Sequence, residues 1–188
     1  MKKTLLIIIS GPPCTGKTTL GKKITKEFQL PFISKDDIKE SLFDNLGWND
    51  REQSKKFGVA SYSLLYYFIE SLLSVGVPFI VESNFKSEFD NEKFLNIKNK
   101  YDFEPFQIIC KTNGEILFKR FKTRSESDER HPGHVDHLNY DEFKKTLLND
   151  KHENLDIGGK IFNIDTTDFN LIDYDKLFNA IKSAINKT

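Results

Sequence analysis

The sequence predicts an α/β fold in which helices cover both faces of a parallel sheet. Short, continuous apolar runs recur along the 188 residues, which is typical of strands buried on both faces. Segments with helical periodicity separate these runs, and such alternation favours parallel strand pairing. The length suits one domain with a sizeable core, and neither a repeat nor a linker interrupts the pattern. Residues 1–188 are therefore expected to form a single domain with five strands.

Each expected element rests on a local pattern. "TLLIII" and "PFIVES" are short apolar runs, and in the helix after Gly16 an apolar stripe is formed by Leu20, Ile24 and Phe28. An acidic residue, Asp36, opens the next helix, where the helix dipole favours anions. The expected strands are 4–9, 31–34, 78–83, 106–112 and 160–167, and the expected helices are 17–28, 36–46, 51–75, 87–100, 114–124, 140–150 and 173–186.

Two segments differ from the rest. Residues 51–75 carry the longest helical pattern, and Gly76 and Pro78 end it. Residues 125–139 are polar, contain Pro and Gly and show no periodicity. We expect the second segment to be a loop or a mobile lid.

The composition narrows the class of protein. The 28 basic and 28 acidic side chains balance to a net charge of zero, which weakens the case for a nucleic-acid partner, although a local groove can still be basic. The two cysteines do not suggest a disulfide framework, and the longest apolar run is too short to span a bilayer. A cytoplasmic, soluble protein is expected.

A phosphate-binding loop follows the first strand. The stretch "GPPCTGKTT" fits G-x-x-x-x-G-K-[ST], and a buried strand precedes it while an amphipathic helix follows. Glycines let the backbone N–H groups turn toward a phosphate, and the helix N-terminus adds partial positive charge. The alternative, a plain Gly/Pro turn, explains less of the pattern. The expected ATP-binding residues are Gly11, Pro12, Pro13, Cys14, Thr15, Gly16, Lys17, Thr18 and Thr19.

Three of these residues have individual expectations. Lys17 is expected to bind the β- and γ-phosphates, and the Thr18 hydroxyl to ligate Mg²⁺. Thr19 could reach the α-phosphate. Cys14 is expected to fill space rather than act as a nucleophile. The expected cofactors are therefore ATP and Mg²⁺.

Carboxylates at two strand ends indicate where the acceptor would bind. Asp36 and Asp37 follow the second strand, at the rim where open parallel sheets bind ligands. Asp36 could accept a proton from an attacking hydroxyl as a general base, or it could simply cap a helix. Lys35 or Lys39 could hold an anionic acceptor. Glu82 ends another buried strand and could order Mg²⁺-bound water, or be an ordinary charge at a strand end.

Basic residues and histidines gather near the expected lid. Arg120 and Arg124 lie four residues apart on one helix face and, with Arg130, could stabilise phosphoryl charge at the transition state or form a solvated basic face. The nearby His131, His134, Asp136 and His137 admit a zinc site, but the segment offers no cysteine ligand and no regular helix. A lid whose histidines hydrogen-bond the phosphate or the acceptor fits the pattern better.

The order of these motifs resembles the P-loop kinases of the polynucleotide kinase and zeta toxin group, which includes chloramphenicol phosphotransferase, among the small AAA-type ATP-binding proteins. "GPPCTGKTT", "SKDDIKESLF", "VESNF" and "KRFKTR" follow the group's order and rough spacing over about residues 4–125. The resemblance implies a nucleoside-monophosphate-kinase-like P-loop NTPase fold with a five-stranded parallel sheet in the order 2-3-1-4-5. The "RHPGH" stretch has no counterpart in the polynucleotide kinase pattern.

The resemblance also implies residue roles. Asp36 matches the general base, Arg120 and Arg124 match the lid arginines, and Lys39 stands where the group has a basic residue near the acceptor phosphate. Lysine in place of arginine weakens bidentate recognition there. Glu82 matches the acid after the third strand, and Asn84 the asparagine after it.

These motifs predict transfer of the ATP γ-phosphate to a hydroxyl but leave the acceptor open. A small molecule or a nucleotide-like acceptor is expected, in a pocket formed from residues 37–75. The aromatics of this stretch, Trp48, Tyr62 and Tyr66, fit core packing better than stacking on substrate. A nucleic-acid 5′-hydroxyl kinase is an alternative. The rival class is an ATP-binding and hydrolysing switch without an acceptor.

Overall fold

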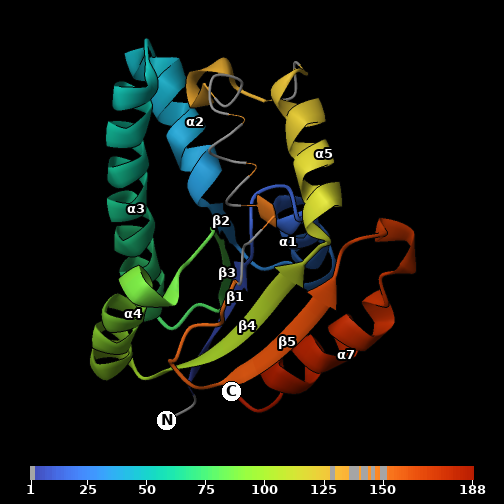
Figure 1. The fold of residues 1–188 in the computed structure, drawn as a ribbon. Coiled ribbons are helices and arrows are strands. Elements are labelled where there is room, and N and C mark those ends of the chain that lie inside the picture. The colour runs from blue at the N-terminus through green and yellow to red at the C-terminus, as the bar shows by residue number, and fades with distance from the viewer. Residues whose placement is uncertain (1–2, 128–129, 136–139, 141–143, 145–146, 149–151) are drawn as a thin grey trace.

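The fold is a five-stranded parallel sheet in the order β2-β3-β1-β4-β5 (Figure 1). The computed structural model describes residues 3–127, 130–135, 140, 144, 147–148 and 152–188. The strands are β1 (Thr4–Ser10), β2 (Phe32–Ser34), β3 (Phe79–Glu82), β4 (Phe103–Lys111) and β5 (Lys160–Asp165). The predicted fold class, strand count and strand order are confirmed.

Helices alternate with the strands, as the sequence pattern predicts. They are α1 (Lys17–Phe28), α2 (Lys35–Leu46), α3 (Arg51–Ser74), α4 (Ser87–Tyr101), α5 (Gly114–Ser125) and α7 (Tyr174–Ile185), with short 3₁₀ turns η1 (Pro132–His134) and η3 (Phe169–Leu171). Much of the helix predicted at 140–150, together with Asp136 and His137, lies outside the described residues.

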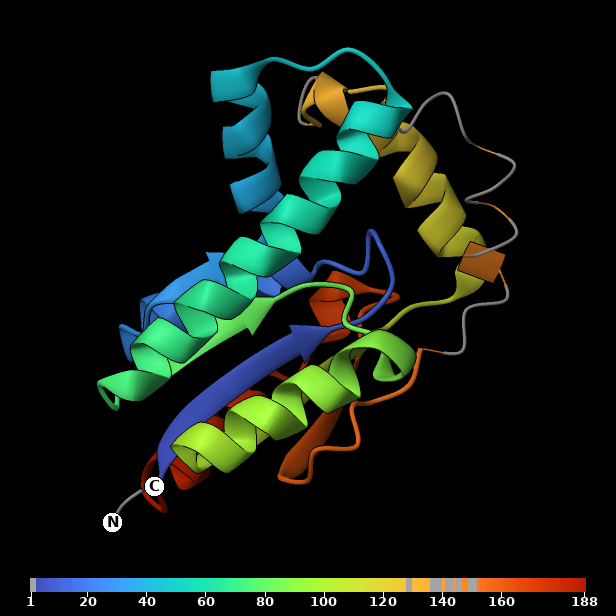
Figure 2. The same ribbon diagram turned by 90° about the vertical axis from the view of Figure 1, so that its left-hand side faces the viewer.

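The two faces of the sheet carry separate apolar clusters. Leu6 and Ile8 of β1 point toward α3 and α4, where they pack with residues such as Leu65 and Phe94. Leu5, Ile7 and Ile9 point the other way, toward α1 and α7. This alternation follows from the two-residue period of a strand, and Figure 2 shows α3 and α4 on one side of the sheet. The wholly apolar run in β1 is explained because both faces are covered.

One boundary differs from the prediction. β4 begins at Phe103, three residues before the predicted start at 106, and pairs with β1 from Thr4↔Phe103 onward. The polar Glu104 and the N–H-lacking Pro105 interrupt the apolar pattern at this end of the strand. Pairing with β1 inside the sheet, rather than the propensity of the local sequence, extends the strand to Phe103.

The parallel strands end together. Ser34 of β2 pairs with Glu82 of β3, and Glu82 pairs with Ile9 of β1, so the chain segments that follow these three strands meet at one edge of the sheet. Above that edge, α2 and α3 stand on one side and α5 on the other (Figure 1). Within the described part of the chain, no helix has the length and apolar character that crossing a membrane requires.

Candidate active site

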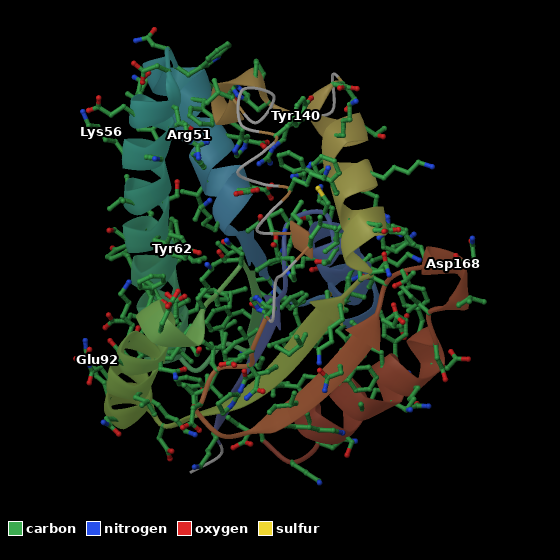
Figure 3. The ribbon with its side chains drawn as sticks, viewed as in Figure 1. Arg51, Lys56, Tyr62, Glu92, Tyr140 and Asp168 are labelled. Atoms are coloured by element: carbon green, nitrogen blue, oxygen red, sulfur yellow. The ribbon has the colours of Figure 1, made fainter. Side chains whose placement is uncertain are left out.

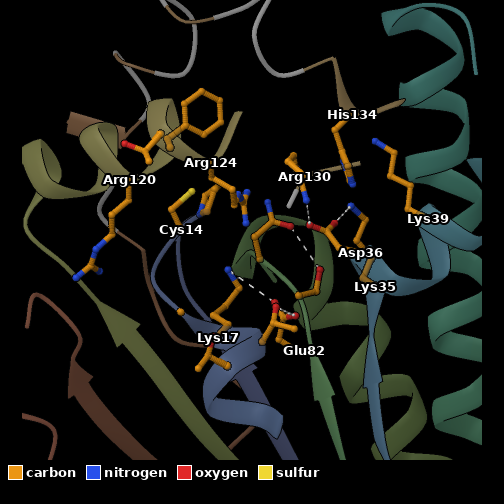
Figure 4. Close-up of a pocket in the computed structure, with 18 of the residues that line it drawn as sticks. Cys14, Lys17, Lys35, Asp36, Lys39, Glu82, Arg120, Arg124, Arg130 and His134 are labelled. Atoms are coloured by element: carbon orange, nitrogen blue, oxygen red, sulfur yellow. Dashed lines mark hydrogen bonds and ion pairs between the residues drawn. The ribbon is translucent and has the colours of Figure 1, made fainter. Parts of the chain in front are cut away.

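A cavity of about 980 Å³ lies at this edge of the sheet. Its walls come from the loop after β1, the start of α2, the first turns of α3, the end of β3, the inner side of α5 and the segment around Arg130 (Figure 4). The position agrees with the rule that open parallel sheets bind ligands beyond the carboxyl ends of their strands. Sequence segments separated by more than a hundred residues therefore share one site.

The loop after β1 has the backbone shape that its glycines predict. Gly11 has φ +144° and Gly16 has φ +80°, both in the region that favours glycine. A side chain at Gly11 would lie 2.4 Å from the Cys110 carbonyl oxygen, and one at Gly16 would lie 2.5 Å from the Phe169 ring. Thr15 donates its hydroxyl hydrogen to the Pro12 carbonyl oxygen at 2.9 Å, which braces the loop from inside. Cys14, at φ 65°, is half-buried and lines the cavity.

Lys17 and Thr18, the first residues of α1, lie next to Glu82. The Lys17 Nζ donates to the Pro12 carbonyl oxygen at 2.9 Å and lies 3.8 Å from Glu82 Oε1. Thr18 and Ser34 each donate a hydroxyl hydrogen to Glu82 Oε2 at 2.9 Å. Glu82 is buried, and these donors compensate for the loss of its hydration. The phosphate loop and the acid at the end of β3 therefore lie next to each other.

The oxygens of Thr18 and Glu82 fit a Mg²⁺ site whose remaining ligands would be waters and nucleotide phosphates. Mg²⁺ prefers hydroxyl and carboxylate oxygens and keeps several waters and substrate phosphates in its shell. Thr18 Oγ1 and Glu82 Oε2 adjoin each other at the cavity wall. Over the described ranges of the chain, no cluster of three or more His, Cys, Asp or Glu side chains has the arrangement of a metal site.

Asp36 lines the cavity at the start of α2, and its two carboxylate oxygens bind different cations. Lys35 Nζ lies 2.9 Å from Oδ1, and Arg130 Nη1 lies 3.1 Å from Oδ2 (Figure 4). Burial opposes ionisation, but the charges of Lys35 and Arg130 outweigh it and hold the pKa of Asp36 well below its usual range. Asp36 is therefore a carboxylate at neutral pH. The second acid of the pair, Asp37, is exposed and does not line the cavity.

Lys39 is buried at the cavity wall, one helical turn beyond Asp36. Its Nζ donates to the Ser54 hydroxyl at 2.9 Å and lies 5.2 Å from the centre of the Phe43 ring. Ser54 belongs to α3 and is itself buried. The bond therefore joins α2 to α3 and directs the lysine into the site.

The RHPGH segment, residues 130–134, is docked against α2. Arg130 Nη1 lies 3.5 Å from Glu40 Oε1, and His134 Nε2 donates to the same oxygen at 2.9 Å. Burial lowers the pKa of His134, so the ring is neutral at pH 7 and its Nε2 hydrogen is available to Glu40. His131 contacts another carboxylate of α2, Asp44, at 3.1 Å. Arg130 and His134 line the cavity. The two histidines contact different acids, Asp44 and Glu40, and so do not converge on one metal site.

Gly133 allows this close packing. The His131 ring stacks on Phe43 with 5.0 Å between centroids, and a side chain at position 133 would lie 2.7 Å from the Phe43 ring. Since Phe43 is 1% exposed, it has little room to move.

We expect Gly133→Ala to destabilise the protein by about 1–3 kcal/mol, the usual cost of overpacking. Thermal unfolding measures the change as a lowered Tm, roughly 2–4 °C for each kcal/mol in a chain of this size. Gly58→Ala is the matched control, because a side chain at this position in α3 meets nothing within 4 Å. It should stabilise the protein by about 0.5–1 kcal/mol. An unchanged Tm in the Gly133 variant would contradict the role given to this glycine.

The two arginines of α5 do different things. Arg120 donates from Nη1 to the Thr166 carbonyl oxygen and from Nη2 to that of Thr167, both at 2.8 Å, and its guanidinium lies 4.2 Å from the centre of the Phe169 ring. Its head therefore points away from the Lys17 side of the cavity (Figure 4). Arg124 is half-buried and lines the cavity one turn further along α5. Both arginines line the cavity, but the Arg120 guanidinium is bound by the turn after β5.

Asn84 and the predicted aromatic residues lie at the side of α3. Asn84 lines the main cavity and accepts a hydrogen bond from Tyr62 OH at 2.9 Å. Tyr62 and Tyr66 line a separate cavity of about 700 Å³ between α3 and α4, and both pack against the core. Trp48 is 39% exposed and contacts the edge of the His131 ring. None of these three aromatics lines the main cavity.

Several lining residues escaped the sequence interpretation. Arg51, Ser54 and Lys55 reach the cavity from α3, and Phe169 from the turn after β5. The spacing of the first three, at i, i+3 and i+4, places them on one helix face and could have marked them. Phe169 has no such signal, since only the close approach to Gly16 brings it into the site.

A glycine-rich phosphate loop at the head of a 2-3-1-4-5 parallel sheet, with acids at the neighbouring strand ends, defines the P-loop kinase group of proteins. A family model described as an AAA domain matches residues 6–148. The chain belongs to this AAA domain family. The predicted resemblance is thereby confirmed.

Solved structures agree with this assignment. A protein from Chloroflexus aurantiacus J-10-fl, described as a "putative kinase", is 33% identical over all of both chains, with a TM-score of 0.88. A gluconokinase from Sinorhizobium meliloti 1021 is 14% identical over 99% of this chain and 97% of its own, with a TM-score of 0.54. A chain of the Pnkp1/Rnl/Hen1 RNA repair complex is 15% identical over 81% of this chain and 48% of its own, also at 0.54. The last two show a shared fold alone. No curated protein matches the chain significantly.

Proposed function

We propose that the protein is an ATP-dependent phosphotransferase that moves the γ-phosphate of ATP to a hydroxyl of a small molecule or a nucleotide-like acceptor. The observation that carries this proposal is the shared cavity, in which Lys17 and Thr18 lie on one side and the carboxylate of Asp36 on the other. Phosphoryl transfer needs this arrangement, because the attacking oxygen must lie in line with the bond that breaks.

Each residue then has a part in the reaction. The backbone N–H groups of the loop from Cys14 to Gly16 and the Lys17 ammonium hold the triphosphate. Thr18 and Glu82 would hold Mg²⁺, which neutralises phosphate charge when bound. Asp36 orients the acceptor hydroxyl and takes its proton. A bond forms between the acceptor oxygen and the γ-phosphorus, the bond to the bridging oxygen breaks, and ADP leaves. Cys14 and Cys110 are not joined in a disulfide, which agrees with a reducing compartment such as the cytoplasm.

The nucleotide base would lie near the turn after β5. Arg120 donates hydrogen bonds to the carbonyl groups of Thr166 and Thr167, at the end of the "NIDTT" stretch (163–167), and Phe169 contacts both Arg120 and the loop at Gly16. We therefore give Arg120 a positioning role, and leave contact with the transferring phosphate to Arg124.

The two arginines should respond differently to substitution. Arg124→Ala should lower kcat by about 10²-fold, because cationic stabilisation of the transferring phosphoryl group is lost. Arg120→Ala should mainly raise the KM for ATP, since the 166–167 turn loses two hydrogen bonds. Steady-state kinetics of ATP consumption, in the presence of an acceptor that receives the phosphoryl group, measures both constants. Equal losses of kcat in the two variants would show that both arginines act on the phosphoryl group, contrary to this division.

Incubation with ATP labelled at the γ-phosphate tests the function itself. Separate pools should contain metabolites, antibiotics and 5′-hydroxyl oligonucleotides, and the products should be resolved by chromatography. Label in a small-molecule product supports the proposal, and label in the oligonucleotides supports a nucleic-acid 5′-hydroxyl kinase. If label appears as free phosphate alone in every pool, the protein is instead an ATP-hydrolysing switch.

A further inference from the structure

The end of the cavity opposite Lys17 is lined mainly by cations. Lys35 and Arg130 pair with the Asp36 carboxylate. Beyond them, Lys39 of α2 and Arg51 and Lys55 of α3 also line the cavity, while among the described residues only Asp36 and Glu82 contribute carboxylates to its wall. The chain as a whole has zero net charge. Among the described lining residues, cations therefore outnumber carboxylates because α3 packs on α2, and not because the composition is basic.

The group is built into the fold. Lys39 and Ser54 are 8% and 4% exposed, and the lysine donates to the serine hydroxyl at 2.9 Å. Arg51, Ser54 and Lys55 occupy one face of the first turns of α3. Two further cations therefore flank Ser54, the residue to which Lys39 is bonded. Keeping a lysine buried costs solvation energy. A cavity wall of this kind attracts an anion more strongly than an exposed basic surface does.

The nucleotide phosphates have their own ligands elsewhere. The loop at 11–16, Lys17 and Arg124 lie at the α1 and α5 side of the cavity, whereas Lys39 lies beside Asp36 and the segment at Arg130 (Figure 4). The α3 residues enter from the same side as Lys39, since Lys39 and Ser54 are bonded. A triphosphate held by the loop leaves this second cationic group to the acceptor.

We infer that the acceptor is an anionic alcohol, whose phosphate or carboxylate group binds Arg51 and Lys55 of α3 with Lys39 while its hydroxyl binds Asp36. This inference rests on the proposed function. The guanidinium of Arg51 matches either oxyanion with two parallel donors, and the lysines add point charges. Asp36 and Lys39 are one helical turn apart, about 5–6 Å between Cβ atoms. The hydroxyl and the anionic group therefore belong to one small molecule or one nucleotide unit.

Binding of simple anions to the nucleotide-saturated protein tests this inference. Titration calorimetry should first establish that the protein binds the non-hydrolysable ATP analogue AMP-PNP with Mg²⁺, which fills the P-loop. Inorganic phosphate and acetate are then titrated separately as probes of the two oxyanion chemistries. We expect one site for at least one probe. Arg51→Gln combined with Lys55→Gln should weaken that binding by about tenfold or more.

Lys56→Gln is the matched control. Lys56 is the next residue of α3, pairs with Glu52 at 2.8 Å and has a side chain that is 72% exposed. It projects from the outer side of the helix, while Arg51 lies on the side of the cavity (Figure 3). The control removes one charge from the same helix without touching the cavity wall, so it should leave anion binding within about twofold of wild type.

The possible outcomes separate the two proposals. If AMP-PNP binds but neither anion does, or if the α3 double variant and the Lys56 variant bind the anion equally, the inference is overturned while the proposed function stands. If AMP-PNP itself does not bind, the proposed function fails and this inference fails with it. Retained binding of AMP-PNP in the double variant shows that the variant is folded and that any loss concerns the acceptor end.

Discussion

Asp36→Asn is expected to reduce phosphoryl transfer by about 10²-fold or more while leaving nucleotide affinity nearly unchanged. The amide has the shape of the carboxylate but cannot take the acceptor proton. Asp36 lies on the acceptor side of the cavity, away from the ligands proposed for the triphosphate. Quenched measurement of labelled product gives kcat, and titration with Mg²⁺ and AMP-PNP gives nucleotide affinity.

Asp37→Asn supplies the comparison. Asp37 has the same side chain and is the next residue in the chain, but it is exposed and does not line the cavity. Its variant should turn over within about twofold of wild type. Near-normal turnover in the Asp36 variant, or equal losses in both variants, would remove Asp36 from the role of base.

The acidity of Asp36 sets a further expectation for the same experiment. Lys35 and Arg130 overcome the effect of burial and hold the pKa of Asp36 well below its usual range. The active carboxylate form is then present above that lowered pKa and is lost only as the pH falls through it. Between about pH 5 and 8, the wild-type rate should show no step from this group. So weak a base orients the hydroxyl first and accepts the proton late, which suits a loose phosphoryl transition state.

The sequence sufficed where the chemistry is local. The phosphate loop needs a fixed spacing of glycine, lysine and threonine, so Gly11, Gly16, Lys17 and Thr18 could be predicted without a structure. Gly16, Lys17 and Thr18 line the cavity, and Gly11 has the positive φ that favours glycine. Glu82 and Asp36 could be predicted for a similar reason: Glu82 ends one short strand, Asp36 follows another, and parallel strands end at one edge of the sheet.

Features that depend on tertiary packing could not be predicted from the sequence. Arg51 and Lys55 look like an ordinary charged helix surface until α3 packs against α2. Spacing places Arg120 and Arg124 on one helix face, but the carbonyl groups of Thr166 and Thr167 turn the first away from the phosphate side. The RHPGH segment has no sequence period to reveal that its partners are Glu40 and Asp44 of α2.

Lys17→Ala should have the largest effect of all, because it acts on both binding and chemistry. In the structure the Lys17 ammonium bonds to the Pro12 carbonyl oxygen inside the loop and lies beside Glu82, so it is already held at the mouth of the phosphate site. Its removal takes away a cation from the β- and γ-phosphates and leaves the buried Glu82 charge with hydroxyl donors alone. We expect nucleotide affinity to fall by about tenfold or more and transfer by about 10³-fold or more.

Lys22→Ala is the control for this prediction, since Lys22 belongs to the same helix but is exposed and does not line the cavity. Its variant should bind Mg²⁺ and AMP-PNP as the wild type does. Thermal unfolding without nucleotide separates lost binding from lost folding, because a variant that melts near the wild-type Tm has kept its core. A folded Lys17 variant that still binds nucleotide at wild-type affinity would mean that backbone N–H groups alone hold the phosphates. In that case the donor half of the proposed site would need another cation, for which Arg124 is the candidate that this cavity offers.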